Sequence, residues 1–153
     1  GDLTVGQSLA ILEWLDETHP EPPLLPADPW ARLQVRAFAD LIACDIHPLN
    51  NLAVLTKLRT EFSADAETVS AWYQDWIIRG FTALEAQAAS APAKPFLFGD
   101  RPTLAEVCLV PQMYNARRFD TPLGAFPRLV EVDAKCSEID AFRRASPDVV
   151  KPG

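Results

Sequence analysis

Residues 103–113, which read TLAEVCLVPQM, decide what kind of fold this chain adopts. Thr103 is followed three residues later by Glu106, the pattern of a capping box, in which two side chains satisfy free backbone N–H groups at a helix start. The residues behind it are apolar nearly all round, which is typical of a helix buried on every side. We therefore expect a central helix surrounded by others, with a kink at Pro111.

Helical patterns occupy most of the chain on both sides of this stretch. The clearest lies before it, where apolar side chains recur at i, i+3, i+4 and i+7 over residues 69–84, after a start at Ser63 or Asp65. The other helices are expected at residues 28–59, interrupted by Pro48, and at 127–136 and 138–145. Helices joined by short connections predict an all-α helical bundle.

The beginning of the chain has a different pattern. Leu3-Thr4-Val5 is β-prone and leads directly into a helical pattern at residues 7–17, which stops near Thr18. One strand cannot form a sheet, so we expect its partners to lie outside these residues or in another chain. The predicted parts are a terminal strand and helix of an α/β domain at 1–18, a stiff proline-rich linker at 19–28, and a helical domain at 29–153.

Composition excludes several classes of function. The net charge of -7 argues against nucleic acid and anionic membrane surfaces as partners, because both require a basic surface. No apolar run approaches the roughly 20 residues that span a bilayer. The first residues do not form a signal peptide, so we expect a cytoplasmic protein.

The cysteines and histidines do not suggest a metal centre. Cys44, Cys108 and Cys136 are widely spaced, and we expect reduced, mostly buried thiols, with Cys44 and Cys108 packed among apolar neighbours. The two histidines, His19 and His47, are too isolated for a metal cluster, so no metal is expected.

Three polar groups are candidates for ligand contacts, and each has a structural alternative. Gln7 and Ser8 start a helix, where they would bind a carboxylate or Ser8 would merely cap the helix. The polar residues around Pro48 would face a ligand cleft or satisfy a carbonyl freed by the proline. The arginines at 117–118 would recognise a substrate carboxylate or complement the helix dipole.

Six segments, in the same order, resemble zeta-class glutathione transferases, the maleylacetoacetate isomerase family. They are QSLAILEWLDE at 7–17, PLLPADP at 23–29, CDIHPLNNL at 44–52, the capping box at 99–106, CLVPQ at 108–112 and NARRF at 115–119. The resemblance covers essentially the whole chain, with Glu106 standing where the family usually has Asp.

The resemblance implies a thioredoxin-like domain followed by a glutathione-transferase helical domain, in a homodimer. It also implies glutathione as cosubstrate and a small dicarboxylate as substrate. The implied reaction is cis–trans isomerisation of maleylacetoacetate to fumarylacetoacetate in aromatic amino-acid breakdown, and maleylpyruvate isomerases are similar. The glutathione thiol adds to the conjugated double bond, which rotates as a single bond before the thiol leaves.

The resemblance also implies roles for individual residues. Gln7 and Ser8 match positions that hold the γ-glutamyl end of glutathione. The positions that line the glutathione site from the helical domain are His47, Asn51, Leu52 and Ala53. Arg118 matches an arginine that pairs with a substrate carboxylate. Ala53 replaces a Ser or Arg of the family, which leaves the exact dicarboxylate open.

The family's Ser-Ser-Cys motif, which stabilises the thiolate, is not among these residues. We therefore expect residues 1–153 alone to be inactive, with the catalytic residues outside them. Two alternatives to the isomerase remain: a broader zeta-class transferase or dehalogenase acting on small α-halo acids, and a non-catalytic assembly module with the same fold.

Overall fold

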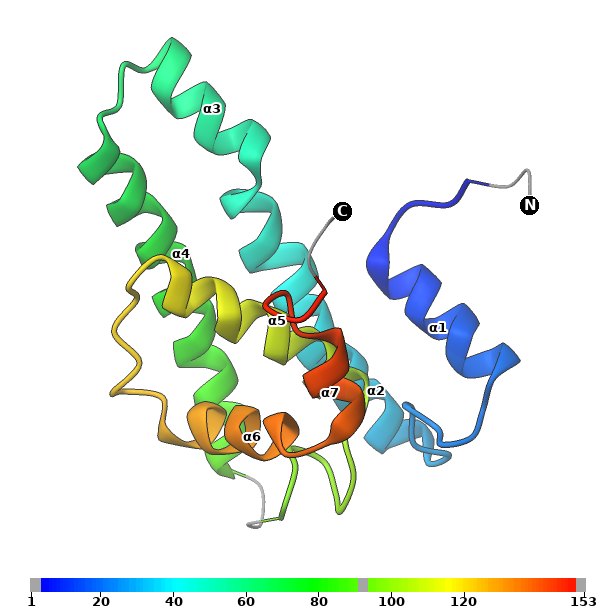
Figure 1. The fold of residues 1–153 in the computed structure, drawn as a ribbon. Coiled ribbons are helices and arrows are strands. Elements are labelled where there is room, and N and C mark those ends of the chain that lie inside the picture. Colours follow the sequence, from blue (N-terminus) through cyan, green and yellow to red (C-terminus); the bar gives the residue numbers. More distant parts are fainter. Residues whose placement is uncertain (1–3, 91–93, 151–153) are drawn as a thin grey trace.

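The computed structural model describes residues 4–90 and 94–150, and these residues form helices with no strand among them (Figure 1). The α-helices are α1 (Ser8–Thr18), α2 (Pro29–Asp40), α3 (Leu52–Glu61), α4 (Ala66–Ser90), α5 (Leu104–Arg118), α6 (Pro127–Ser137) and α7 (Asp140–Ala145). Between α2 and α3 lie a π-helical turn, η1 (Leu41–Ile46), and a 3-10 turn, η2 (His47–Asn50). The prediction of an all-α bundle is confirmed.

The strand predicted at residues 3–5 is not formed in its described part. Leu3 lies outside the described residues, and Thr4 and Val5 belong to no strand. A strand needs a neighbour for its backbone hydrogen bonds, and residues 4–90 and 94–150 supply none.

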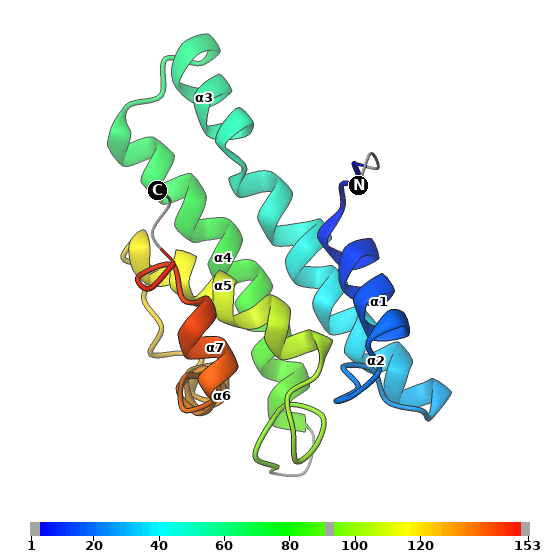
Figure 2. The same ribbon diagram turned by 45° about the vertical axis from the view of Figure 1, so that its right-hand side comes forward.

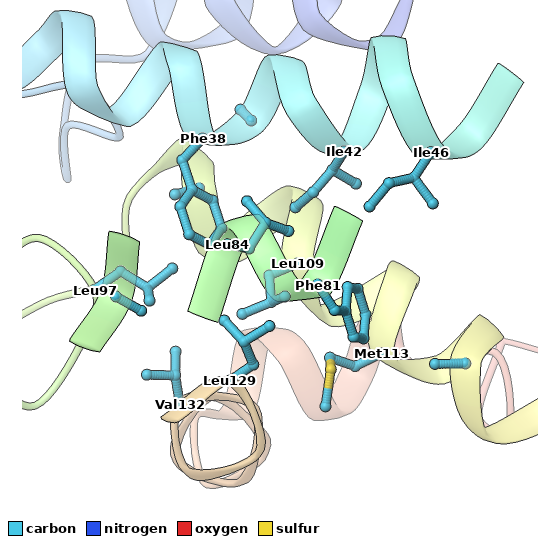
Figure 3. Close-up of a cluster of buried hydrophobic side chains, with 14 of the residues drawn as sticks. Phe38, Ile42, Ile46, Phe81, Leu84, Leu97, Leu109, Met113, Leu129 and Val132 are labelled. Atoms are coloured by element: carbon cyan, nitrogen blue, oxygen red, sulfur yellow. The ribbon is translucent and has the colours of Figure 1, made fainter. Parts of the chain in front are cut away.

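The core surrounds α5, as its sequence predicted. Leu104, Leu109 and Met113 of this helix are buried, and apolar side chains of α2, η1, α4 and α6 cover them (Figure 3). Figure 3 shows side chains from these elements directed toward one another, among them Phe38, Ile42, Ile46, Phe81, Leu84, Leu129 and Val132. Pro111 lies within α5 on its exposed side, where it displaces no core side chain.

Polar side chains fix where several helices begin. The predicted capping box is present: Glu106, fully buried, accepts hydrogen bonds from the backbone N–H and the hydroxyl of Thr103, both at 2.7 Å, and from the N–H of Leu97 at 2.7 Å. Asp28 accepts from the N–H of Ala31 at 2.8 Å and starts α2 ahead of Pro29. These caps anchor each helix start at the residue that the sequence indicated.

The predicted interruption at Pro48 takes the form of η1 and η2. The close approach of α4 is possible here because Gly80 faces Ile46, whose side chain occupies the space that a Cβ would need. Beyond this point α3 and the N-terminal half of α4 form a hairpin that projects away from α6 and α7 (Figures 1 and 2).

Helix α1 lies beside α2 at the edge of the bundle, on the side away from α4 (Figures 1 and 2). Arg36 of α2 donates two hydrogen bonds to the carboxylate of Glu13, at 2.7 and 2.8 Å. Asp16 accepts from the backbone N–H of Leu24 in the linker at 2.6 Å. No residue of α1 is buried, and Trp14 is 58% exposed.

Candidate functional site

The start of α1 carries the first two predicted ligand contacts. Gln7 precedes the helix with φ 74°, a value uncommon for a residue with a side chain, and Ser8 is the first helical residue. The helix has no side-chain cap, so the alternative in which Ser8 merely caps it is wrong. The N–H groups of the first turn are open to an acceptor from outside the helix, which suits a carboxylate.

Four further predicted contacts lie on η2 and at the start of α3: His47, Asn51, Leu52 and Ala53. All four are exposed, and Leu52 is 73% exposed. Asn51 is the N-cap of α3, because its side-chain oxygen accepts from the N–H of Ala53 at 3.0 Å. The amide nitrogen of Asn51 remains free to donate to a ligand.

An open hollow of about 680 Å³ runs along α3. Three of the predicted contacts line it, together with polar side chains of the next two turns: Asn51, Leu52, Ala53, Thr56, Lys57, Thr60 and Glu61. Its surface therefore combines an apolar start with hydrogen-bonding groups farther along the helix.

The two adjacent arginines at the end of α5 have different surroundings. Arg117 donates to the buried carboxylate of Asp133 on α6 at 2.6 Å. Burial raises the pKa of Asp133, and the positive charge of Arg117 opposes that shift. Arg118 is exposed, lies 5.9 Å from the ring centroid of Phe119, and forms no ion pair with any residue in 4–90 or 94–150. Arg117 is thus a structural group, and Arg118 is available to an anion.

The last turn of α5 holds Arg118 in a defined place. Asp120 adopts a positive φ of 52°. The N–H of Thr121 donates to the carbonyl of Ala116 at 2.9 Å, and the N–H of Asp120 donates to the carbonyl of Arg117 at 3.0 Å. These bonds form a Schellman motif, a common way of closing a helix.

Two of the predicted segments meet on α4. Asn50 in η2 donates to the carbonyl of Tyr73 at 3.1 Å, and the ring of Tyr73 stacks on that of Phe119. The loop that carries His47 and Asn51 and the helix end that carries Arg118 therefore share one support. The start of α1 lies at the same end of α2 as η1 and η2 (Figures 1 and 2), with no hydrogen bond from Gln7 or Ser8 to those segments in the described chain.

Two polar groups of α4 were not singled out from the sequence. Tyr73 and Phe81, which belong to the apolar pattern at residues 69–84, are buried in the core. Trp72, however, donates its indole N–H to the carbonyl of Leu49 at 2.9 Å, and Gln74 donates to the carbonyl of Phe119 at 2.8 Å. The only sign of these two hydrogen bonds in the sequence is that a tryptophan and a glutamine flank Tyr73 on a helix with an otherwise apolar pattern.

The thiols of Cys108 and Cys136 are not activated. Burial raises the pKa of Cys108 to about 11 and that of Cys136 to about 12. The prediction that Cys44 is buried is wrong: it is exposed on η1, since it lies between Ile42 and Ile46 on the opposite face of the turn. Activation requires a lowered pKa, so neither Cys108 nor Cys136 is suited to act as a nucleophile.

Other classes of site are absent from the described ranges. Residues 4–90 and 94–150 contain no group of three or more His, Cys, Asp or Glu side chains that could hold a metal ion. Within the same ranges no helix is long and apolar enough to cross a membrane.

Comparison with known proteins gives the context of this site. Residues 66–144 match the family model described as the glutathione S-transferase C-terminal domain. The chain is 51% identical over 142 residues to a maleylpyruvate isomerase from Ralstonia sp, a match that covers 92% of this chain and 67% of that protein.

Two solved structures are similar over nearly the whole chain. The holo structure of a maleylpyruvate isomerase, a bacterial zeta-class glutathione transferase, superposes with a TM-score of 0.96 at 49% identity, covering 99% of this chain and 72% of that one. A maleylacetoacetate isomerase from Anaeromyxobacter dehalogenans superposes with a TM-score of 0.90 at 43% identity, covering 97% of this chain and 65% of that one. The latter holds dicarboxyethyl glutathione and citrate in its active site.

Proposed function

The chain belongs to the zeta-class glutathione transferases, the family of maleylacetoacetate and maleylpyruvate isomerases. From this membership we propose that it forms part of a glutathione-dependent cis–trans isomerase. The substrate is a cis-unsaturated dicarboxylate of the maleylpyruvate or maleylacetoacetate type. The observation that carries the proposal is a pair of groups suited to anions: the start of α1, which has no side-chain cap, and Arg118, which pairs with no acidic side chain among residues 4–90 and 94–150.

The residues present fit glutathione. Its γ-glutamyl carboxylate suits the first turn of α1, where Gln7 and Ser8 add side-chain hydrogen bonds to the free backbone donors. From the helical side, the residues that would hold it are His47, Asn51, Leu52 and Ala53. Glutathione, when bound, supplies the thiol nucleophile.

Arg118 serves the other end of the site. A guanidinium presents paired donors that match a carboxylate, and Arg118 has no competing acidic partner among the described side chains. It would bind and orient the substrate carboxylate. Ala53, on the glutathione side, adds no polar side-chain contact to a ligand. The part of the substrate beyond its double bond is therefore recognised by other groups.

We expect the working enzyme to contain a thioredoxin-like domain ahead of the linker and to be a homodimer. The chain spans 67% of the Ralstonia protein, and Ile11, Trp14 and Leu15 give α1 an exposed apolar face of the kind that a neighbouring domain covers. Residues 1–153 alone should not turn over substrate, because the family's Ser-Ser-Cys motif, which stabilises the glutathione thiolate, is not among them.

Turnover by the full-length protein that carries this chain tests the proposal. Maleylpyruvate, maleylacetone (a stable analogue of maleylacetoacetate) and dichloroacetate would be compared at equal concentration with and without glutathione. Isomerisation of a maleyl compound well above dechlorination supports the isomerase. Faster dechlorination would instead assign a dehalogenase, and no glutathione binding at millimolar concentration would favour a non-catalytic module.

A further inference from the structure

Three consecutive residues of α4 contact both segments that carry candidate ligand contacts. One segment, here called the glutathione wall, is η2 with the residue after it and carries His47 and Asn51. The other, the substrate-carboxylate wall, is the end of α5 and carries Arg118. The indole N–H of Trp72 donates to the carbonyl of Leu49, and the carbonyl of Tyr73 accepts from Asn50, both in η2. The amide N–H of Gln74 donates to the carbonyl of Phe119, the residue directly after Arg118. One turn of one helix therefore holds two segments that are about 70 residues apart in the sequence.

The links to η2 support the wall that carries His47 and Asn51. The carbonyl of Leu49 lies where η2 ends and α3 has not yet begun, so no regular helix bond fixes it there. Asn50 is only 8% exposed, and its bond to Tyr73 ties the same turn to α4 from the interior. Removing the donor of a buried or half-buried hydrogen bond costs more free energy than removing the donor of an exposed one, because the acceptor is left without a partner.

The link to Phe119 supports the wall that carries Arg118. The side-chain amide of Gln74 donates to the carbonyl of Phe119 at 2.8 Å and to that of Asp120 at 3.4 Å; Phe119 is the C-cap of α5, and Asp120 is the left-handed residue of the Schellman motif. The ring of Phe119 stacks on the ring of Tyr73, and its centroid lies 5.9 Å from the guanidinium carbon of Arg118. A shift of this turn would move the guanidinium with it.

We infer that Trp72 and Gln74 are positioning residues that set the two walls separately, Trp72 the glutathione wall and Gln74 the substrate-carboxylate wall. The inference rests on the proposed function, since that function assigns a ligand to each wall. Both residues project from one long helix, which keeps the walls at a fixed separation. Loss of one bond should therefore weaken one ligand and leave the other unchanged.

The test uses two variants that remove a donor and little else, Trp72→Phe and Gln74→Met, in the full-length protein, with Gln74→Leu as a second variant without a donor. Trp30→Phe on α2 and Gln87→Met on α4 are the controls, because both side chains are exposed and neither donates a hydrogen bond to a described residue. The KM values for glutathione and for the maleyl substrate are measured separately, together with the melting temperature.

We expect each substitution to change the KM for one ligand and not the KM for the other. Trp72→Phe raises the KM for glutathione roughly three- to tenfold and leaves the KM for substrate unchanged, while the Gln74 variants do the reverse. The controls change neither value. Equal rises in both KM values, or a lower melting temperature with both KM values unchanged, would overturn the inference. A wild type without glutathione-dependent turnover would overturn the proposed function itself.

Discussion

The ring of Tyr73 stacks on the ring of Phe119, with centroids 3.6 Å apart and planes inclined by 12°. This contact joins the middle of the bundle to the end of α5, one residue beyond Arg118. The guanidinium carbon of Arg118 lies 5.9 Å from the centroid of the Phe119 ring. Burial raises the pKa of the Tyr73 phenol, and the positive charge of Arg118 opposes that shift. The arginine proposed to bind substrate therefore lies beside this aromatic pair and forms no ion pair with an acidic residue in 4–90 or 94–150.

The first prediction concerns this arginine. Arg118→Ala should lower kcat/KM for the maleyl substrate by about 10- to 100-fold, because it removes a charged hydrogen-bonding partner of a carboxylate. The melting temperature should stay within a degree or two of the wild type, since Arg118 is exposed and unpaired in the described part of the chain. Steady-state kinetics and a thermal melt measure the two effects.

Its neighbour provides the control. Arg117→Ala should leave Asp133 buried without its partner and lower the free energy of unfolding by about 1–3 kcal/mol, with kcat/KM near the wild-type value. If both variants lost activity to the same extent, the division into one structural and one ligand-binding arginine would be wrong.

The capping box gives the second prediction. Glu106→Gln should lower the free energy of unfolding by about 2–4 kcal/mol, because its amide cannot accept from all three donors that the carboxylate now satisfies. Glu67→Gln, at an exposed position in the first turn of α4, should change it by less than about 0.5 kcal/mol. Urea denaturation gives both values, and equal losses would contradict the role assigned to Glu106.

Much of the fold could be predicted because it depends on local patterns. The capping box at Thr103, the caps at Asp28 and Asp65 and the break at Pro48 are signals within a few residues, and each is present. The π-helical form of η1 was not predicted, since the spacing of its buried residues also fits an α-helix.

The candidate site was predictable only in part. The sequence could not tell which of the two arginines at 117–118 is paired, because the partner, Asp133, lies on another helix. Trp72 and Gln74 were missed for the same reason: their acceptors are backbone carbonyls of distant segments, which carry no side-chain signal.

Glu85 illustrates such a distant contact and gives the third prediction. Its carboxylate, on α4, accepts from the N–H groups of Arg128 and Leu129 at 2.9 and 3.0 Å and so caps α6. Glu85→Ala should lower the free energy of unfolding by about 1–3 kcal/mol. Hydrogen exchange should accelerate most in the first turns of α6. Uniform acceleration over the whole chain would argue against a local cap.

The half-buried thiol of Cys108 gives the fourth prediction, on pH. The pKa of Cys108 is raised from 9.0 to about 11, so the folded protein keeps this proton after the unfolded chain has lost it. The stabilisation is complete below pH 9 and is lost as the pH rises toward 11, at roughly 1.4 kcal/mol per pH unit. Urea midpoints at pH 8 and pH 10.5 should therefore differ less in Cys108→Ala than in the wild type. An equal difference in both proteins would show that Cys108 does not contribute.

The measurement that tests the central claim most directly is the conversion of maleylpyruvate to its trans isomer by the full-length protein, followed with and without glutathione. The account predicts conversion that requires glutathione, saturates with it, and consumes none of it. Conversion at the same rate without glutathione, or stoichiometric loss of glutathione into a stable conjugate, would contradict the proposed isomerase.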